Sequence, residues 1–233
     1  MQNDLVANLA AVRKRIENAA LRAGRDAEDV KLVAVSKTHP ADMIEQVIAA
    51  GATTFGENKV QEAEWKIPDV GRLKAEWHLI GHLQSNKARK AVQLFDVIHS
   101  LDSVDLAARL ERICLEENRP ALPVFVQVDL AREETKSGVT TDELPALTDY
   151  LRSCTRVIFD GLMLLPPFSD NAEDARPFFR ELKGLRDELA SDGAFPPGRR
   201  GELSMGMSHD FEIAIEEGAT VIRVGTAIFG ERG

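Results

Sequence analysis

The chain has 233 residues, of which 29 are Lys or Arg and 38 are Asp or Glu, so its formal net charge is −9. This length suits one large α/β domain or two small ones. The excess of acidic residues argues against nucleic acid or an anionic membrane as the main partner. The two cysteines, Cys114 and Cys154, suggest neither a disulfide framework nor a metal site. No stretch resembles a signal peptide or a membrane span, so we expect a cytoplasmic protein. We also expect no metal in the site.

The first predicted element is an amphipathic helix over residues 4–23. Its apolar face would carry Leu5, Val6, Leu9, Val12, Ile16 and Ala20. A short apolar run at 32–35 follows and predicts a strand that is buried on both faces, as in parallel sheets. Seven further strands alternate with helices along the chain. The eight strands are expected at 32–35, 53–56, 77–80, 95–99, 123–130, 157–165, 202–205 and 220–224, and the helices between and after them at 40–50, 59–64, 86–94, 103–118, 141–151, 172–190 and 208–217.

Eight βα units without a linker predict a closed parallel barrel, the (β/α)8 TIM barrel, as one domain over residues 1–233. An open doubly wound sheet is the alternative, but no G-x-G-x-x-G follows the first strand. The loops after the strands of a barrel share one mouth. This mouth would bring together Lys37, Asn58, His82, Ser208 and Thr226.

Lys37 stands directly after the first strand, in the decapeptide KLVAVSKTHP. A lysine at the end of a buried strand is poorly solvated, which lowers its pKa and makes its free amine a usable nucleophile. A Schiff base with an aldehyde is the chemistry that such a lysine most often serves. The alternative is a lysine whose stem packs under the loop while its ammonium reaches water.

The loops after the last two strands contain residues suited to a phosphate. Ser208, in LSMGMSHD, is expected to cap the helix that follows it, and a helix N-terminus attracts anions. Gly225 and Thr226, after the eighth strand, would let the backbone approach a ligand closely and add a hydroxyl. Alternatively, Ser208 is only an N-cap, Asp210 only complements the helix dipole, and Gly225 only forms a turn. Barrels often place a phosphate site in these two loops, which favours the functional interpretation.

A lysine on the first strand and phosphate loops on the neighbouring last two fit a phosphorylated aldehyde such as pyridoxal 5′-phosphate (PLP). The chain also resembles a known family, the PLP homeostasis proteins (the YggS/PROSC family of PLP-binding proteins), from about residue 33 to residue 232. The resemblance rests on the segments VAVSKTHP, FGENKVQEAEWK, WHLIGHLQSNK, HSLDS, ETKSG, GLML, LSMGMSHD and IRVGTAIFGER. Two positions depart from the commoner pattern of this family, Asp129 and Leu164.

The resemblance implies a barrel similar to the N-terminal domain of alanine racemase, with PLP joined to Lys37 as an internal aldimine. It further implies that Asn58 lies beside the cofactor ring and that Arg223 faces the pyridine nitrogen. The cofactor contacts expected near the phosphate are Met207, Ser208, Gly225 and Thr226. His82 follows the third strand and could approach the cofactor, although a capping or packing role is an open alternative.

Arg223 bears on the kind of chemistry that the site supports. Most PLP enzymes pair the pyridine nitrogen with an acid, which keeps the ring protonated and strongly electron-withdrawing. A guanidinium offers only donors and stays charged, so opposite Arg223 the nitrogen should remain unprotonated and carbanion chemistry should be weak. A surface salt bridge from Arg223 to Glu216 or Glu217 is the alternative.

The resemblance implies a non-enzymatic PLP carrier that holds PLP as a Schiff base and buffers or delivers it, with PLP-dependent apo-enzymes as recipients. We expect a monomer. The alternatives are a PLP-dependent amino-acid racemase and a cofactor-free barrel with a structural lysine. Racemisation by the alanine racemase route needs a second base, a tyrosine from a separate C-terminal domain. This chain ends at Gly233, and its one tyrosine, Tyr150, falls in a helix between strands.

Overall fold

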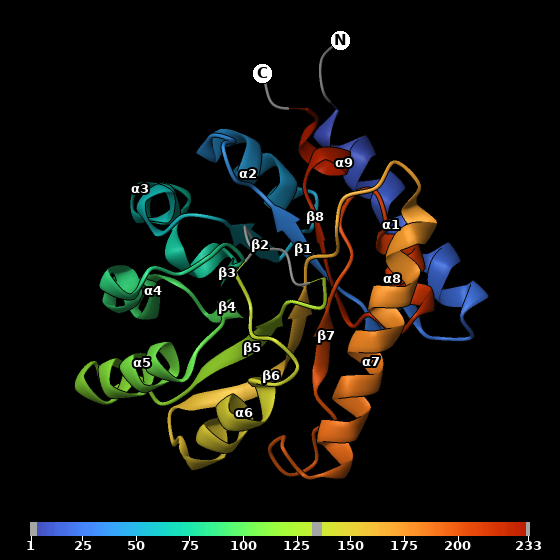
Figure 1. Ribbon diagram of the computed structural model, residues 1–233. Helices are drawn as coiled ribbons and strands as arrows, with labels where there is room; N and C mark the ends of the chain where they lie inside the picture. The colour runs from blue at the N-terminus through green and yellow to red at the C-terminus, as the bar shows by residue number, and fades with distance from the viewer. Residues whose placement is uncertain (1–3, 132–136, 232–233) are drawn as a thin grey trace.

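The computed structural model describes residues 4–131 and 137–231, and in it eight parallel strands close into a barrel surrounded by helices (Figure 1). The strands follow one another around the ring in chain order, and the last pairs with the first, Arg223 lying beside Val33. The predicted (β/α)8 fold is therefore confirmed. The strands are β1 Lys31–Val35, β2 Thr54–Glu57, β3 Glu76–Leu79, β4 Val97–Leu101, β5 Leu122–Val128, β6 Val157–Leu164, β7 Glu202–Ser204 and β8 Val221–Val224.

The helices form the outer layer. They are α1 Leu5–Arg22, α2 Ala41–Ala49, α3 Val60–Val70, α4 Ala88–Leu94, α5 Val104–Glu116, α6 Leu144–Ser153, α7 Arg176–Ser191, α8 Phe211–Glu216 and α9 Thr226–Phe229, with 3-10 turns at Ala27–Asp29, Arg72–Lys74, Ser85–Lys87 and Ala172–Ala175. Helix α9 is too short to cover the last strand. Helix α1, although it precedes β1 in the chain, packs against α8, α9 and α2 and so completes the outer ring there (Figure 1).

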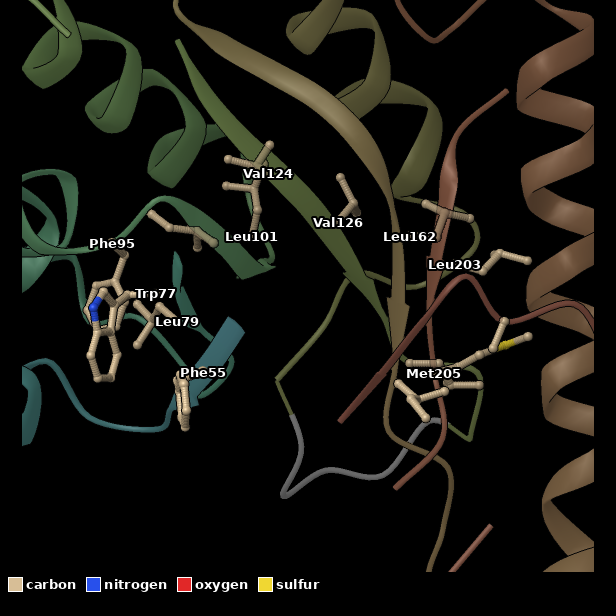
Figure 2. Packing of buried hydrophobic residues seen from close by; sticks show 14 of the residues in the cluster. Phe55, Trp77, Leu79, Phe95, Leu101, Val124, Val126, Leu162, Leu203 and Met205 are labelled. Atoms are coloured by element: carbon tan, nitrogen blue, oxygen red, sulfur yellow. The ribbon is translucent and has the colours of Figure 1, made fainter. Parts of the chain in front are cut away.

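Successive residues of each strand face either the helices or the barrel interior, because side chains alternate along a strand. The outward set packs under the helices in one large apolar cluster. Figure 2 shows part of it, with Phe55, Trp77, Leu79, Phe95, Leu101, Val124, Val126, Leu162, Leu203 and Met205 labelled. The inward set includes a smaller apolar cluster of Val33, Val97, Phe125, Met163 and Val221. Fully burying one large apolar side chain contributes roughly 1.5–3 kcal/mol, so the outward cluster carries most of the stabilisation.

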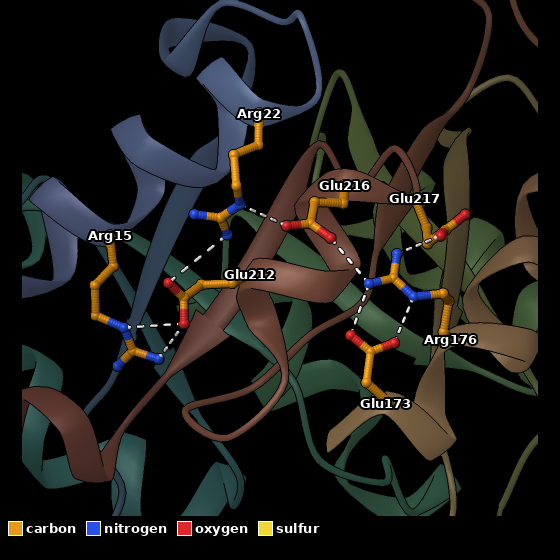
Figure 3. A network of polar contacts seen from close by, with 7 residues as sticks. All are labelled: Arg15, Arg22, Glu173, Arg176, Glu212, Glu216 and Glu217. Carbon is orange, nitrogen blue, oxygen red and sulfur yellow. Dashed lines mark hydrogen bonds and ion pairs between the residues drawn. The ribbon is translucent and has the colours of Figure 1, made fainter. Parts of the chain in front are cut away.

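An ion network ties α1 to the helices beside it (Figure 3). Arg15 and Arg22 of α1 reach Glu212 at 2.7 and 4.0 Å, and Arg22 also reaches Glu216 at 2.8 Å. Arg176 at the start of α7 binds Glu216 from the other side at 2.9 Å. Glu173 and Glu217 bind the same guanidinium, both at 2.6 Å. The network joins α1, α8 and α7 across the part of the ring where the barrel closes.

One expectation about α3 and one about α1 were wrong. Helix α3 continues past the predicted end at residue 64, because Ile67 and Val70 extend its buried face and Pro68 falls in the last turn. Val6 was expected on the buried face of α1 but is 57% exposed. The ETKSG segment lies mostly outside the described residues.

The described residues contain no helix that is long and apolar enough to cross a membrane. Within the same residues, no group of three or more His, Cys, Asp or Glu side chains is placed to hold a metal ion. Cys114 is buried in α5 and Cys154 follows α6, and both are free thiols. Burial raises the pKa of each thiol to about 11, so both stay protonated at neutral pH.

Candidate functional site at the mouth of the barrel

Lys37 lies where β1 opens into the mouth of the barrel, as predicted. The preceding residue still belongs to the sheet, since the Ser36 N–H donates to the Gly56 carbonyl at 3.0 Å. The chain then turns, and the His39 N–H donates back to the Ser36 carbonyl at 3.1 Å. Lys37 is half-buried within this turn. The His39 ring stacks on Phe229 of α9 with ring centres 4.9 Å apart, which joins the loop after β1 to the segment after β8.

The loops after β7 and β8 are joined through Ser208. Its Oγ accepts hydrogen bonds from the N–H groups of Gly225 at 3.1 Å and Ala227 at 3.3 Å. Ser208 therefore caps the short helix α9, and the expectation that it caps the helix directly after it was wrong. Helix α8 begins at Phe211 with Asp210 at its N-cap position. Ser208 thus lies beside the first N–H groups of α9, which have no partner within that helix.

Asp210 and Met207 shape the rim beside Ser208. The Asp210 Oδ1 accepts from the Met207 N–H at 2.6 Å, and this bond closes the turn between β7 and α8. Burial raises the pKa of Asp210, while the Met207 N–H and the charge of Arg223 act in the opposite direction. The Met207 side chain is 36% exposed and so remains accessible at the mouth.

Arg223 lies inside the barrel, 2% exposed, and does not form the surface salt bridge that was the alternative. Its Nη1 donates to Ser204 Oγ at 2.5 Å and its Nη2 donates to the Leu164 carbonyl at 2.8 Å. The second hydrogen bond goes to the backbone carbonyl of Leu164. The side chain at this position, where the chain departs from the family pattern, therefore does not affect the bond. Burial lowers the pKa of Arg223 to about 10, opposed by Asp210, and the group stays charged at neutral pH. Within residues 4–131 and 137–231, no carboxylate forms an ion pair with it.

Behind Arg223, a chain of buried polar groups crosses the barrel interior. Ser204 Oγ accepts from Arg223 and lies 2.8 Å from His99 Nδ1. His99 Nε2 lies 2.8 Å from His78 Nδ1, and His78 Nε2 lies 3.2 Å from Glu76 Oε1. Because a carboxylate only accepts, we assign the hydrogen of His78 to Nε2, which leaves His78 Nδ1 to accept from His99 and His99 Nδ1 to accept from Ser204. Burial lowers the pKa of both histidines. Both rings are therefore neutral at pH 7, with the hydrogen on Nε2.

Asn58 and His82 follow β2 and β3. Asn58 is half-buried, and Gly81 lies so close to it that a Cβ at position 81 would be 2.3 Å from the Asn58 carbonyl oxygen. His82 is exposed, and its Nδ1 lies 3.2 Å from Asp102 Oδ2 on the next loop. Burial raises the pKa of Asp102, an effect that His82 opposes. His82 thus has a partner at the rim, and its contact with a cofactor remains a prediction.

Sequence reasoning missed two sets of buried polar residues. His99 and Ser204 behind Arg223 come from strands far apart in the chain. The only local signal for them is that alternation along a buried strand points each side chain into the barrel. The second set is Glu57, Glu62 and Lys66, which contact the turn around Lys37. Glu62 and Lys66 stand four residues apart on α3, a spacing that usually indicates a solvated ion pair.

A family model, "Alanine racemase, N-terminal domain", matches residues 7–233 of the chain. The chain is 43% identical over 226 residues to a pyridoxal phosphate homeostasis protein of Aquifex aeolicus, covering 96% of each chain. It is 41% identical over 241 residues to the Escherichia coli protein of the same name, covering 99% of this chain and 97% of that one.

The solved structures include a similar chain, PipY of Synechococcus elongatus PCC7942 with PLP bound. It is 40% identical to this chain, with a TM-score of 0.81. The match covers 97% of this chain and 100% of PipY. The likeness therefore extends over nearly the whole chain.

Proposed function

The chain belongs to the alanine racemase N-terminal domain family and, within it, to the pyridoxal phosphate homeostasis proteins, and from this premise we propose that it binds PLP, buffers it and delivers it without turning over a substrate of its own. PLP-dependent apo-enzymes are the proposed recipients, and the carrier acts as a monomer. When bound, PLP supplies an aldehyde carbon that forms a Schiff base with a lysine amine, one water molecule leaving.

The groups at the mouth fit the chemistry of PLP. Lys37 would be the amine that joins the aldehyde. The Ser208 hydroxyl and the backbone N–H of Thr226 would donate to a phosphate, and Gly225, whose own N–H donates to Ser208, would let the backbone approach it closely beside β1. Arg223 would offer its remaining N–H groups to a ring nitrogen. Asn58, Met207 and His82 would make further contacts.

The buried guanidinium of Arg223 is the observation that carries the proposal. Among the described residues, no carboxylate forms an ion pair with Arg223, and such a buried charge is costly, which supports a ligand that accepts its hydrogen bonds. Because it only donates, Arg223 holds a facing ring nitrogen unprotonated and thereby disfavours carbanion chemistry.

A racemase is not favoured by the contacts of the described residues. Racemisation on this barrel requires a second proton-transferring base, and Tyr150, the one tyrosine of the chain, belongs to α6 on the outer layer. Helix α6 packs against α5 and β6. Its position supports a carrier that holds the cofactor with a single amine.

Borohydride trapping tests the proposal. The protein is mixed with PLP, reduced with borohydride and digested, and the mass of each lysine-containing peptide is measured. We expect one reduced PLP adduct, on Lys37, which disappears in Lys37→Ala and persists in Lys90→Ala, a surface variant on α4. An unmodified Lys37 in the wild-type protein would overturn PLP binding through this residue. Racemisation of L-amino acids at an enzyme-like rate would overturn the carrier function.

A further inference from the structure

The turn that carries Lys37 has an unfavourable backbone conformation. Thr38, the next residue, has φ of 68°, in the left-handed region that favours glycine. A β-carbon in this region costs free energy, so the turn needs contacts that hold it. The His39 N–H bond to the Ser36 carbonyl closes the turn but does not by itself fix Thr38.

Three charged side chains meet beside this turn. Lys66 of α3 and Glu57 of β2 are both 0% exposed, and Glu62 of α3 is 16% exposed. The Lys66 Nζ donates to Glu57 Oε1 at 2.9 Å, to Glu62 Oε1 at 2.5 Å and to the Ser36 carbonyl at 2.9 Å. An ammonium has three N–H groups, and each of them here has an acceptor.

The same cluster holds the chain on both sides of Lys37. Before it, Ser36 donates its hydroxyl to Glu57 Oε1 at 2.6 Å, and its carbonyl accepts from Lys66. After it, the Thr38 N–H donates to Glu62 Oε1 at 2.6 Å. The left-handed residue is thus bonded directly to a carboxylate.

We propose that Glu57, Glu62 and Lys66 are positioning residues that hold the Ser36–His39 turn so that the amine of Lys37 is directed at the aldehyde of PLP. The inference rests on the proposed function and adds residues that do not contact the cofactor. Stability alone does not account for the cluster. Buried charged groups can often be replaced by apolar side chains without loss of stability. Here their hydrogen bonds go to the backbone and side chains of the residues flanking Lys37.

Substitution of Glu62 tests the proposal. Glu62→Leu removes the acceptor of the Thr38 N–H, whereas Glu62→Gln keeps an oxygen that can accept from both Thr38 and Lys66. We expect Glu62→Leu to raise the dissociation constant of PLP about tenfold and to lower the fraction of adduct trapped on Lys37 by borohydride. Glu62→Gln should stay close to wild type in both measurements.

Lys66→Met gives an independent second test, because it removes the ammonium and leaves Glu62 in place. The control is Arg119→Met. Arg119 is a partly buried cation that binds the carbonyls of Phe95 and Asp96, at the end of α4 and away from the Lys37 turn. A general loss of stability would affect the control and the Glu62 variant alike, whereas a positioning role affects PLP retention only at Glu62 and Lys66.

The outcomes separate this inference from the proposed function. A wild-type protein that traps no PLP on Lys37 would overturn the proposed function, and this inference with it. Wild-type trapping together with unchanged affinity and adduct fraction in folded Glu62→Leu and Lys66→Met would overturn only the positioning role. Equal losses in Arg119→Met would do the same. Folding is checked for every variant by circular dichroism and urea unfolding.

Discussion

At the scale of single residues, the interior of the barrel is more polar than its buried strands suggest. Arg223 needs acceptors, and it receives them from Ser204 and the Leu164 carbonyl. Ser204 in turn lies within hydrogen-bond distance of His99 Nδ1, at 2.8 Å. The sequence identified Arg223 through its family motif. It could not identify Ser204 and His99, because their partners are set by strands that are far apart in the chain.

Replacing Ser204 should therefore cost stability. Ser204→Ala leaves both an Arg223 N–H and His99 Nδ1 without their partner in a buried place, so the free energy of unfolding should fall by about 1–3 kcal/mol. The control is Ser191→Ala, whose hydroxyl bonds the Asp187 carbonyl on the exposed surface of α7 and should change stability by less than about 0.5 kcal/mol. Urea unfolding measures both. Equal values for the two variants would contradict the role given to Ser204.

At the scale of elements, the order of strands and helices followed directly from the sequence. Alternating apolar runs and amphipathic segments are local signals, and they predicted all eight strands to within a few residues. The capping partner of Ser208 was not predictable in this way. Helix α9 has only four residues and no periodicity, so nothing local indicated that Ser208 binds its first N–H groups and not those of α8.

The close approach of the loops after β2 and β3 leads to a prediction about glycine. In Gly81→Ala the added Cβ would meet the Asn58 carbonyl oxygen at 2.3 Å, so the two loops must move apart. We expect a loss of about 1–3 kcal/mol in unfolding free energy and weaker PLP binding. The same change at Gly184, in the middle of α7 with no atom within 4 Å of the new Cβ, should stabilise the protein by roughly 0.5–1 kcal/mol. Urea unfolding and a PLP titration compare Gly81→Ala with Gly184→Ala. If both variants changed the free energy of unfolding in the same direction, the close contact between Gly81 and Asn58 would be contradicted.

At the scale of the whole molecule, the barrel closes between β8 and β1, and α1 covers that junction. The ion network of Figure 3 binds α1 to α8 and α8 to α7. The sequence predicted the closed barrel but not these ion pairs. The partners of Arg15 and Arg22 lie 197 and 194 residues further along the chain, so no local pattern could indicate them.

The buried histidines make the stability of the whole barrel depend on pH. Burial keeps the folded pKa of His78 and His99 below 6.5, whereas in the unfolded chain both should titrate near 6.5. Below about pH 6.5 the unfolded chain therefore binds protons that the folded chain does not. Stability is then lost as the pH falls, approaching about 1.4 kcal/mol per pH unit for each histidine. Contact with His78 lowers the pKa of Glu76 to about 2. The stability that this carboxylate contributes is therefore lost only between about pH 4.5 and 2, below the pH range in which the histidines act.

Urea unfolding at pH 7.5 and 5.5 measures this loss. His99→Gln should reduce the difference between the two pH values, and His209→Gln, at an exposed position, should leave it unchanged. An NMR titration of the imidazole signals provides the direct check. His99 should keep its neutral chemical shifts at pH 5.5. Its ring is enclosed by His78, Ser204 and Phe125, so burial disfavours the protonated form, and the charge of Arg223 would repel it. A midpoint near pH 6.5 for His99 in the folded protein would refute the neutral chain behind Arg223.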